Sequence, residues 1–112
     1  MNIETSVGIP VDAKLLRNYF DSLVDRFFKI IPIRESEEET LPVYMRSLQL
    51  ELLGCQEFIP ELCMDDEYLT LLSILQYLVD HPECKFASVR REAFRAIRIC
   101  KRLKYLYEKR GC

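Results

Sequence analysis

Apolar residues in this chain recur at alternating steps of three and four positions, and this spacing constrains the fold more than any other feature. It places side chains on one face of an α-helix. Four segments show it, over about 11–31, 40–59, 66–79 and 88–110, and turn-forming residues separate them. No segment shows the sustained alternation that a strand requires. The sequence therefore predicts an all-α fold, a single-domain antiparallel bundle of about four helices.

Residues that favour helix starts and stops mark the ends of these segments. The first helix should run from about Val11 to Ile31 and end at Pro32, because proline disrupts a helix interior. Asp65 or Asp66 is well suited to cap the third helix. Ser88 is the expected N-cap of the fourth.

Length and composition indicate one soluble domain. The chain has 112 residues, of which 49% are hydrophobic and 30% charged. It contains no apolar run near the ~20 residues that a membrane span needs, and its start lacks the pattern of a secretory signal. We therefore expect a cytoplasmic protein without a membrane partner, and leave open whether residues 1–10 are ordered. An odd number of cysteines without a C-x-x-C pair favours reduced thiols. The cysteines are Cys55, Cys63, Cys84, Cys100 and Cys112.

Positive charge is concentrated at the C-terminal end. Residues 85–112 hold ten basic and two acidic residues, a local charge of +8, and the remainder holds six basic and sixteen acidic residues, or −10; together these give the net charge of −2. At 100° per residue, a line of side chains lies opposite the apolar face of the fourth helix. We call these six residues the basic stripe: Arg91, Arg95, Arg98, Arg102, Tyr105 and Lys109.

The basic stripe has three interpretations. It is a solvated helix face with weak ion pairs, a surface that binds nucleic acid, or a surface that binds a protein, including a second copy of this chain. Sixteen carboxylates elsewhere would repel a long polyanion, and no known nucleic-acid-binding motif is present. Among functional interpretations we therefore favour a protein partner and keep nucleic acid as the alternative.

The sequence offers little for catalysis, metal binding or cofactor binding. His81 is the only histidine, and "VDHPEC" is ordinary chemistry for the end of a helix. The carboxylates of "MDDEY" lie where helix caps belong, and there is no glycine-rich phosphate loop. We predict no catalytic residue, metal ligand or cofactor. A pocket that joins His81, Cys84 and carboxylates from another helix would instead indicate an enzyme.

Four aromatic residues lie outside the tightest apolar seams and raise a second question about binding. If several were exposed together they would mark an interface, since exposed apolar patches are usually functional. These residues are Tyr19, Phe28, Tyr44 and Tyr77.

The segments "LPVYMRSLQLELLGCQEFI", "YLTLLSILQYLVDHPEC" and "VRREAFRAI" resemble parts of short helical proteins encoded on bacterial mobile elements. The resemblance covers about half of the chain and includes no motif with a known role. It implies an accessory or inhibitory binder and no activity. The uneven charge and the aromatic residues outside the seams lead us to expect a non-enzymatic protein with an accessory, regulatory or inhibitory role that acts through protein–protein binding.

Overall fold

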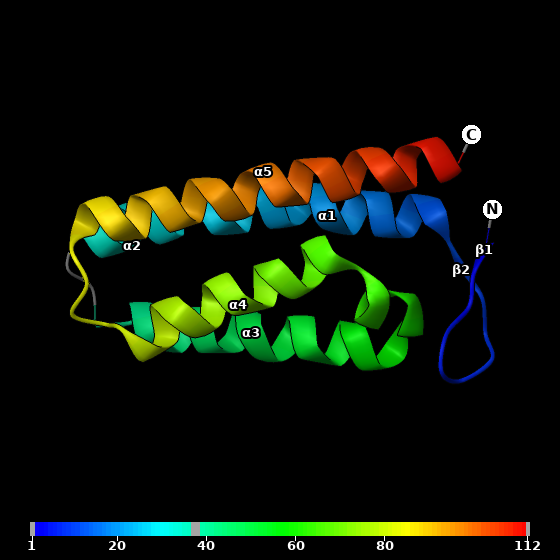
Figure 1. The fold of residues 1–112 in the computed structure, drawn as a ribbon, viewed down its shortest axis with the longest axis horizontal. Coiled ribbons are helices and arrows are strands. Elements are labelled where there is room, and N and C mark those ends of the chain that lie inside the picture. The colour runs from blue at the N-terminus through cyan, green and yellow to red at the C-terminus, as the bar shows by residue number, and fades with distance from the viewer. Residues whose placement is uncertain (1, 37–38, 112) are drawn as a thin grey trace.

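Four long helices run alternately in opposite directions in the computed structural model, which describes residues 2–36 and 39–111 (Figure 1). They are α1 (Ala13–Phe28), α3 (Leu41–Phe58), α4 (Asp66–Asp80) and α5 (Phe86–Arg110). The shorter elements are strands β1 (Asn2–Ile3) and β2 (Val11–Asp12), helix α2 (Ile30–Glu35) and the 3₁₀ helix η1 (Pro60–Met64). The predicted all-α bundle is confirmed.

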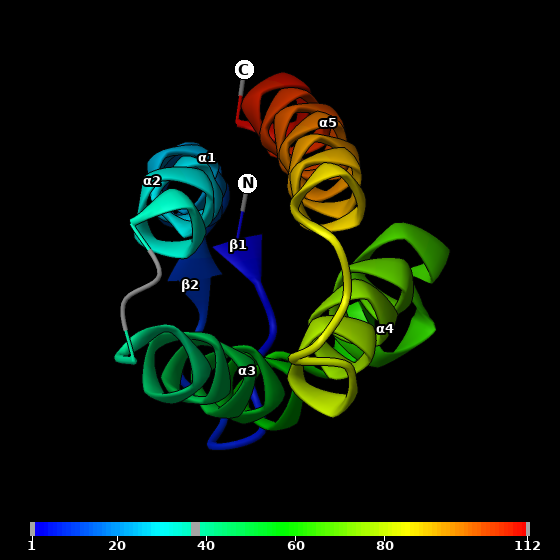
Figure 2. The same ribbon diagram turned by 90° about the vertical axis from the view of Figure 1, so that its left-hand side faces the viewer.

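The helices occupy four corners when the bundle is viewed end-on (Figure 2). In this view α1 lies beside α5 and α3 beside α4, while α3 and α5 are diagonally opposite. Helix α5 has 25 residues and is therefore about 37 Å long, so it packs along both α1 and α2. No helix among the described residues combines the length and the apolar character needed to cross a bilayer.

Pro32 interrupts the first helical segment rather than ending it, which corrects the sequence prediction. In a continuous helix the proline ring would clash with the carbonyl of Phe28, four residues earlier. The chain instead breaks at Lys29 and starts again as α2, with Pro32 in its first turn. Backbone N–H groups in a first turn have no intrahelical acceptor, so the missing donor of proline costs nothing there.

Of the N-caps predicted for α4 and α5, the first is confirmed and the second is wrong. The Asp65 carboxylate accepts hydrogen bonds from the backbone N–H groups of Glu67 (2.9 Å) and Tyr68 (3.1 Å), which confirms Asp65 as the N-cap of α4. The prediction of Ser88 as the N-cap of α5 is wrong, because α5 begins almost one turn earlier, at Phe86. Lys85 takes the cap position without a side-chain hydrogen bond, so the start of α5 carries no side-chain capping signal.

The N-terminal residues form a small hairpin that the sequence did not predict. Strands β1 and β2 pair antiparallel, with Ile3 opposite Val11. Two residues per strand are too few for an alternating pattern to show. Ile3 is 1% exposed, and the Ser6 backbone N–H donates to the Phe58 carbonyl (2.8 Å), so this segment is attached to the end of α3.

The apolar seams form one core, and three aromatic side chains meet inside it. Phe20 of α1 stacks on Tyr107 of α5, with ring centroids 5.7 Å apart, and contacts Tyr68 of α4 edge-on at 6.2 Å. All three are at most 1% exposed. We call Phe20, Tyr68 and Tyr107 the aromatic node, since they join three helices at one place.

The two tyrosine hydroxyls extend the aromatic node to the rest of the molecule. The Tyr68 hydroxyl donates to the backbone carbonyl of Leu52 in α3, and the Tyr107 hydroxyl donates to the Glu61 carboxylate of η1 (2.8 Å). Buried hydroxyls need such acceptors, because an unsatisfied polar group in a core costs about 1–3 kcal/mol. The node thus contacts all four long helices and η1.

Substitutions in the aromatic node test this arrangement. Phe20→Ala should lower the free energy of unfolding by about 3–5 kcal/mol, because it leaves a cavity against two rings. Tyr68→Phe should lower it by only about 1 kcal/mol, through loss of one hydrogen bond. Urea unfolding followed by circular dichroism measures both. Equal losses for the two variants would show that ring packing is not the dominant contribution.

Candidate functional site

All six residues of the basic stripe are exposed on α5 (Arg91, Arg95, Arg98, Arg102, Tyr105 and Lys109). The expected core positions of the same helix are buried (Val89, Ala93, Ala96, Cys100, Leu103 and Tyr107). The structure therefore places the stripe on the solvent face, as the helical spacing predicts.

Two carboxylates within the molecule form ion pairs with three of the five cations of the stripe. Arg91 and Arg95 both contact the Glu92 carboxylate, at 3.5 and 3.2 Å. Arg102 donates from Nε to the Glu67 carboxylate of α4 at 2.7 Å. The arginines of these pairs are well exposed, so each pair adds only about 0–1 kcal/mol to stability. The pairs matter more for a charged partner, because they already balance part of the positive charge of these three arginines.

Part of the unmatched positive charge of α5 lies around one exposed aromatic ring. Among the described residues, Arg98, Lys101 and Lys109 form no ion pair with a carboxylate. They flank Tyr105 along the same side of α5, and Tyr105 is 58% exposed. The Lys109 ammonium lies 4.8 Å from the centre of the Tyr105 ring. We call Arg98, Lys101, Tyr105 and Lys109 the cationic face.

A shallow groove of about 590 Å³ adjoins the cationic face, where the start of α4 approaches α5. Leu106, which is 41% exposed, and Tyr105 supply apolar surface there. Lys101 and Lys109 line the groove together with Asp65 and Glu67. Lys101 and Leu106 belong to the site, although they are not among the site residues predicted from the sequence. Leu106 lies outside the heptad seam of α5, and an apolar residue off that seam is the signal that could have identified it.

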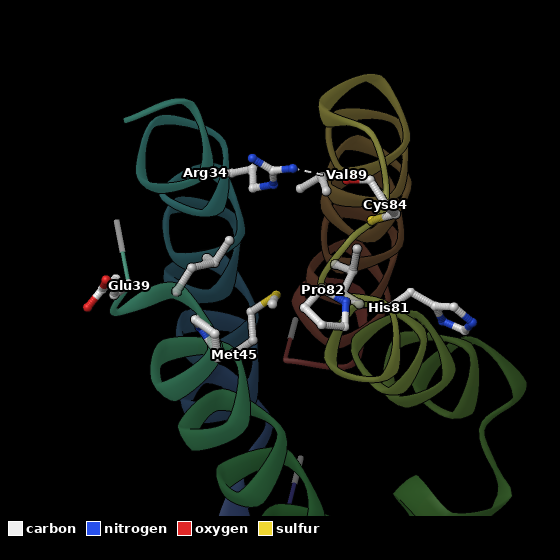
Figure 3. Close-up of a pocket in the computed structure, with 10 residues that line it drawn as sticks. Arg34, Glu39, Met45, His81, Pro82, Cys84 and Val89 are labelled. Atoms are coloured by element: carbon white, nitrogen blue, oxygen red, sulfur yellow. Dashed lines mark hydrogen bonds between the residues drawn. The ribbon is translucent and has the colours of Figure 1, made fainter. Parts of the chain in front are cut away.

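A second pocket, of about 320 Å³, lies at the end of the bundle where α3 and α5 begin and α4 ends (Figure 3). It is lined by Arg34, Glu39, His81 and Cys84 among other residues, the combination that would indicate an enzyme. Figure 3 shows the His81 ring directed away from the pocket and Glu39 at its opposite side. No group of three or more metal-ligating side chains forms among the described residues.

His81 has a structural partner instead. It is the C-cap of α4, its Nδ1 lies 2.9 Å from the Tyr77 carbonyl oxygen, and its ring stacks on Tyr77 at 4.5 Å between centroids. The interpretation of His81 as a residue that ends a helix is confirmed. The Arg34 guanidinium donates to the Cys84 carbonyl (3.0 Å) and so ties α2 to the connection before α5. These contacts do not assemble a nucleophile with a base.

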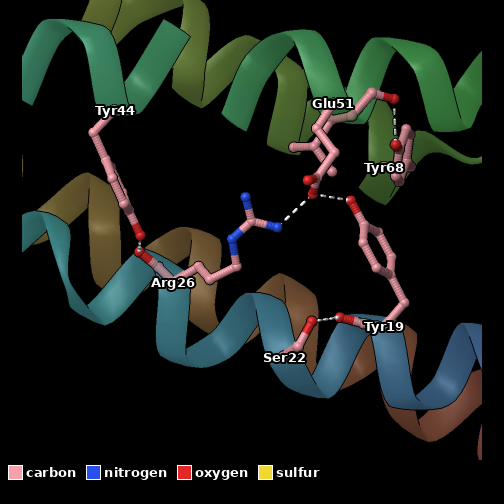
Figure 4. Close-up of polar contacts among 7 residues, drawn as sticks. Tyr19, Ser22, Arg26, Tyr44, Glu51 and Tyr68 are labelled. Carbon is pink, nitrogen blue, oxygen red and sulfur yellow. Dashed lines mark hydrogen bonds and ion pairs between the residues drawn. The ribbon is translucent and has the colours of Figure 1, made fainter. Parts of the chain in front are cut away.

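A group of polar side chains bridges α1 and α3 (Figure 4). The Glu51 carboxylate accepts hydrogen bonds from the Tyr19 hydroxyl (2.7 Å) and from Arg26, and the Tyr44 hydroxyl donates to the Arg26 carbonyl (2.7 Å). Burial raises the pKa of Tyr19 far above its ordinary value. Burial opposes ionisation of Glu51, but the hydrogen bonds from Arg26 and Tyr19 outweigh it and lower its pKa. Neither group titrates near neutral pH, as acid–base catalysis there would require.

The four off-seam aromatic residues do not form a common patch. Tyr19 and Tyr44 are half-buried in the bridge between α1 and α3. Phe28 packs edge-on against Phe94, with centroids 5.6 Å apart, and Tyr77 lies under His81. Tyr19, Tyr44 and Phe28 thus contact other helices, and Tyr77 contacts the end of its own helix.

The cysteines of the described residues are free thiols in different surroundings. Cys100 is fully buried, and burial raises the pKa of its thiol to about 12, which makes it unreactive. Cys55 and Cys84 are half-buried and Cys63 is exposed. Cys112 lies outside the described residues.

Comparison with known proteins gives no relative for this chain: no protein family, no curated protein and no solved structure matches it. The support for the candidate site is consequently the geometry of α5 and of its groove with the start of α4.

The carboxylates that join the elements make stability depend on pH. The hydrogen bond from Arg110 lowers the pKa of Glu61, and that from Tyr107 adds to it against the opposing effect of burial. A carboxyl with a lowered folded pKa stabilises the protein above its unfolded pKa, and that contribution is lost as pH falls through the folded pKa. Between about pH 6 and pH 3, we expect Glu61→Gln to lose less stability than the wild type, by up to about 1 kcal/mol.

Urea unfolding at the two pH values measures this difference. Asp25→Asn, which removes an exposed carboxylate of α1, is the matched control and should follow the wild type. A wild-type loss equal to that of Glu61→Gln would contradict the role of Glu61.

Proposed function

We propose that this protein acts by binding an acidic segment of another protein on the cationic face of α5, without catalysing a reaction. The observation that carries the proposal is the position of three unmatched cations around the exposed ring of Tyr105, beside an apolar groove. The local charge of +8 over residues 85–112 supports it.

The chemistry of the cationic face suits a protein ligand. Tyrosine and arginine are enriched among residues that dominate binding energy, because they bury large surfaces and also form hydrogen bonds. Complementary charge speeds encounter and fixes orientation. A partner segment with carboxylates beside a bulky apolar side chain would therefore match Arg98, Lys101 and the groove at Leu106.

The carboxylates of the groove favour a peptide over a polyanion. Asp65 and Glu67 line the groove together with Lys101 and Lys109. A regular run of phosphates would approach these carboxylates, whereas a peptide can place a neutral or basic residue beside them.

We also place the protein in the cytoplasm, and the free thiols support a reducing compartment.

Nucleic acid is the second candidate, favoured by one observation. Tyr105 is exposed between cations, and an aromatic ring flanked by positive charge is the platform on which unpaired bases stack. Three phosphate contacts from Arg98, Lys101 and Lys109 predict a slope of about −2.7 for log affinity against log salt on duplex DNA.

A peptide library displayed on phage tests the first candidate, with the intact protein as bait. We expect recovered peptides to combine acidic residues with a bulky apolar residue. The double variant Arg98→Glu/Lys101→Glu should weaken their binding by at least about tenfold, or about 1.4 kcal/mol. Fluorescence anisotropy of a labelled recovered peptide measures the change.

The double variant Lys14→Glu/Lys29→Glu is the matched control, because it makes the same change in net charge at exposed positions of α1 and beside it. It should bind the peptide nearly as the wild type does. Equal binding by the α5 variant would contradict the proposal. Binding of a mixed-sequence oligonucleotide with the predicted salt slope, and no selected peptide, would replace it with the second candidate.

A further inference from the structure

Helix α3 carries a second line of regularly spaced residues on its exposed side. Arg46, Leu50, Leu53 and Glu57 follow one another at steps of 4, 3 and 4, so they lie on one face of the helix. All four are exposed, and Leu50 and Leu53 are 56% and 41% accessible to solvent. We call these four residues the α3 seam. It lies away from the buried face formed by Met45, Leu48 and Leu52.

The surroundings of the α3 seam leave space for a close neighbour. Val43, which is 68% exposed, adds apolar surface on the same side. Gly54 is also exposed, and a Cβ at this position would meet nothing within 4 Å. Glycine inside a helix is less favourable than alanine by about 1 kcal/mol, and no close packing within the chain requires it here.

The charges at the two ends of the α3 seam are opposite and unmatched. Arg46 donates a hydrogen bond to the Gln49 side chain (3.2 Å), but among the described residues neither Arg46 nor Glu57 forms an ion pair. The order along the helix is thus a cation, two leucines and an anion. When a second copy of the helix runs in the opposite direction, the same order places each cation opposite an anion and each leucine opposite a leucine.

We propose that two copies of this chain pair along the α3 seam, antiparallel about a twofold axis. With the axis between Leu50 and Leu53, Arg46 of each copy faces Glu57 of the other, and Leu50 faces Leu53. Such an interface is isologous, since the same surface serves both copies. A parallel pair would instead place Arg46 against Arg46 and Glu57 against Glu57, so the charges select the antiparallel arrangement.

The size of the seam limits the strength of the pair. Arg46 and Glu57 are eleven residues apart, or about 16 Å along the helix. A contact along one helix of this length falls below the ~1,200 Å² of stable specific interfaces. We therefore expect a weak, concentration-dependent dimer, detectable by sedimentation between about 5 and 500 µM.

Complementary variants test the pairing. Arg46→Glu and Glu57→Arg should each be monomeric, because each places like charges opposite one another twice. An equimolar mixture of the two should dimerise again, since each copy then faces opposite charges in both pairs. Leu50→Glu should also abolish the dimer. Leu15→Glu, at a leucine of α1 that is 61% exposed, is the matched control and should leave it unchanged.

Sedimentation equilibrium gives the mass of each sample, and circular dichroism checks that each variant is folded. A wild type that stays monomeric up to the highest concentration would overturn the proposal. So would single variants that dimerise as the wild type does, or a mixture that remains monomeric. The variant Arg98→Glu/Lys101→Glu should keep the dimer, which separates this inference from the proposed function of α5.

Discussion

Two buried tyrosine hydroxyls constrain how the helices of this protein fit together. Tyr68 and Tyr107 contribute large rings to the core, but each also brings an O–H group that must find an acceptor inside it. The acceptors belong to other elements, the Leu52 carbonyl of α3 and the Glu61 carboxylate of η1. Apolar side chains alone would tolerate small shifts between helices. Hydrogen bonds from rigid rings do not tolerate such shifts, because their geometry is directional. The aromatic node therefore sets the relative positions of the helices.

The remaining contacts between helices differ in kind around the bundle. Helices α1 and α5 pack closely through small and apolar residues such as Ala93 and Phe20, with the Lys104–Asp21 ion pair (3.1 Å) at the edge. Helices α1 and α3 are connected through the polar group around Glu51. Because neighbouring helices engage every inward face, the outer faces of α5 and α3 are left for other contacts. One is cationic and the other largely apolar with charged ends.

The sequence predicted the features that depend on residues close together along the chain. Periodicity alone placed Val89, Ala96 and Tyr107 inside and Arg98 outside. Two neighbouring carboxylates next to a helix start limited the cap to Asp65 or Asp66, and the structure shows that it is Asp65. It could not show that Arg102 is matched by Glu67, 35 positions away, since that pair exists only when α4 lies beside α5. The same holds for Leu106, whose groove is formed by residues of two elements. The prediction that Pro32 ends the first helix was wrong because the effect of a proline depends on where the helix breaks before it. Here the break at Lys29 places Pro32 in the first turn of a new helix.

The diagonal placement of α3 and α5 has a consequence for valency (Figure 2). A contact along α3 leaves α5 uncovered, so a pair of chains would present two copies of the cationic face on separate sides of one assembly. A target with repeated acidic segments would then be held at two points, and its release would require both to open together. Such avidity can exceed the affinity of one site by 10² or more without any new contact. It would also make retention of the target depend on the concentration of the protein in the cell.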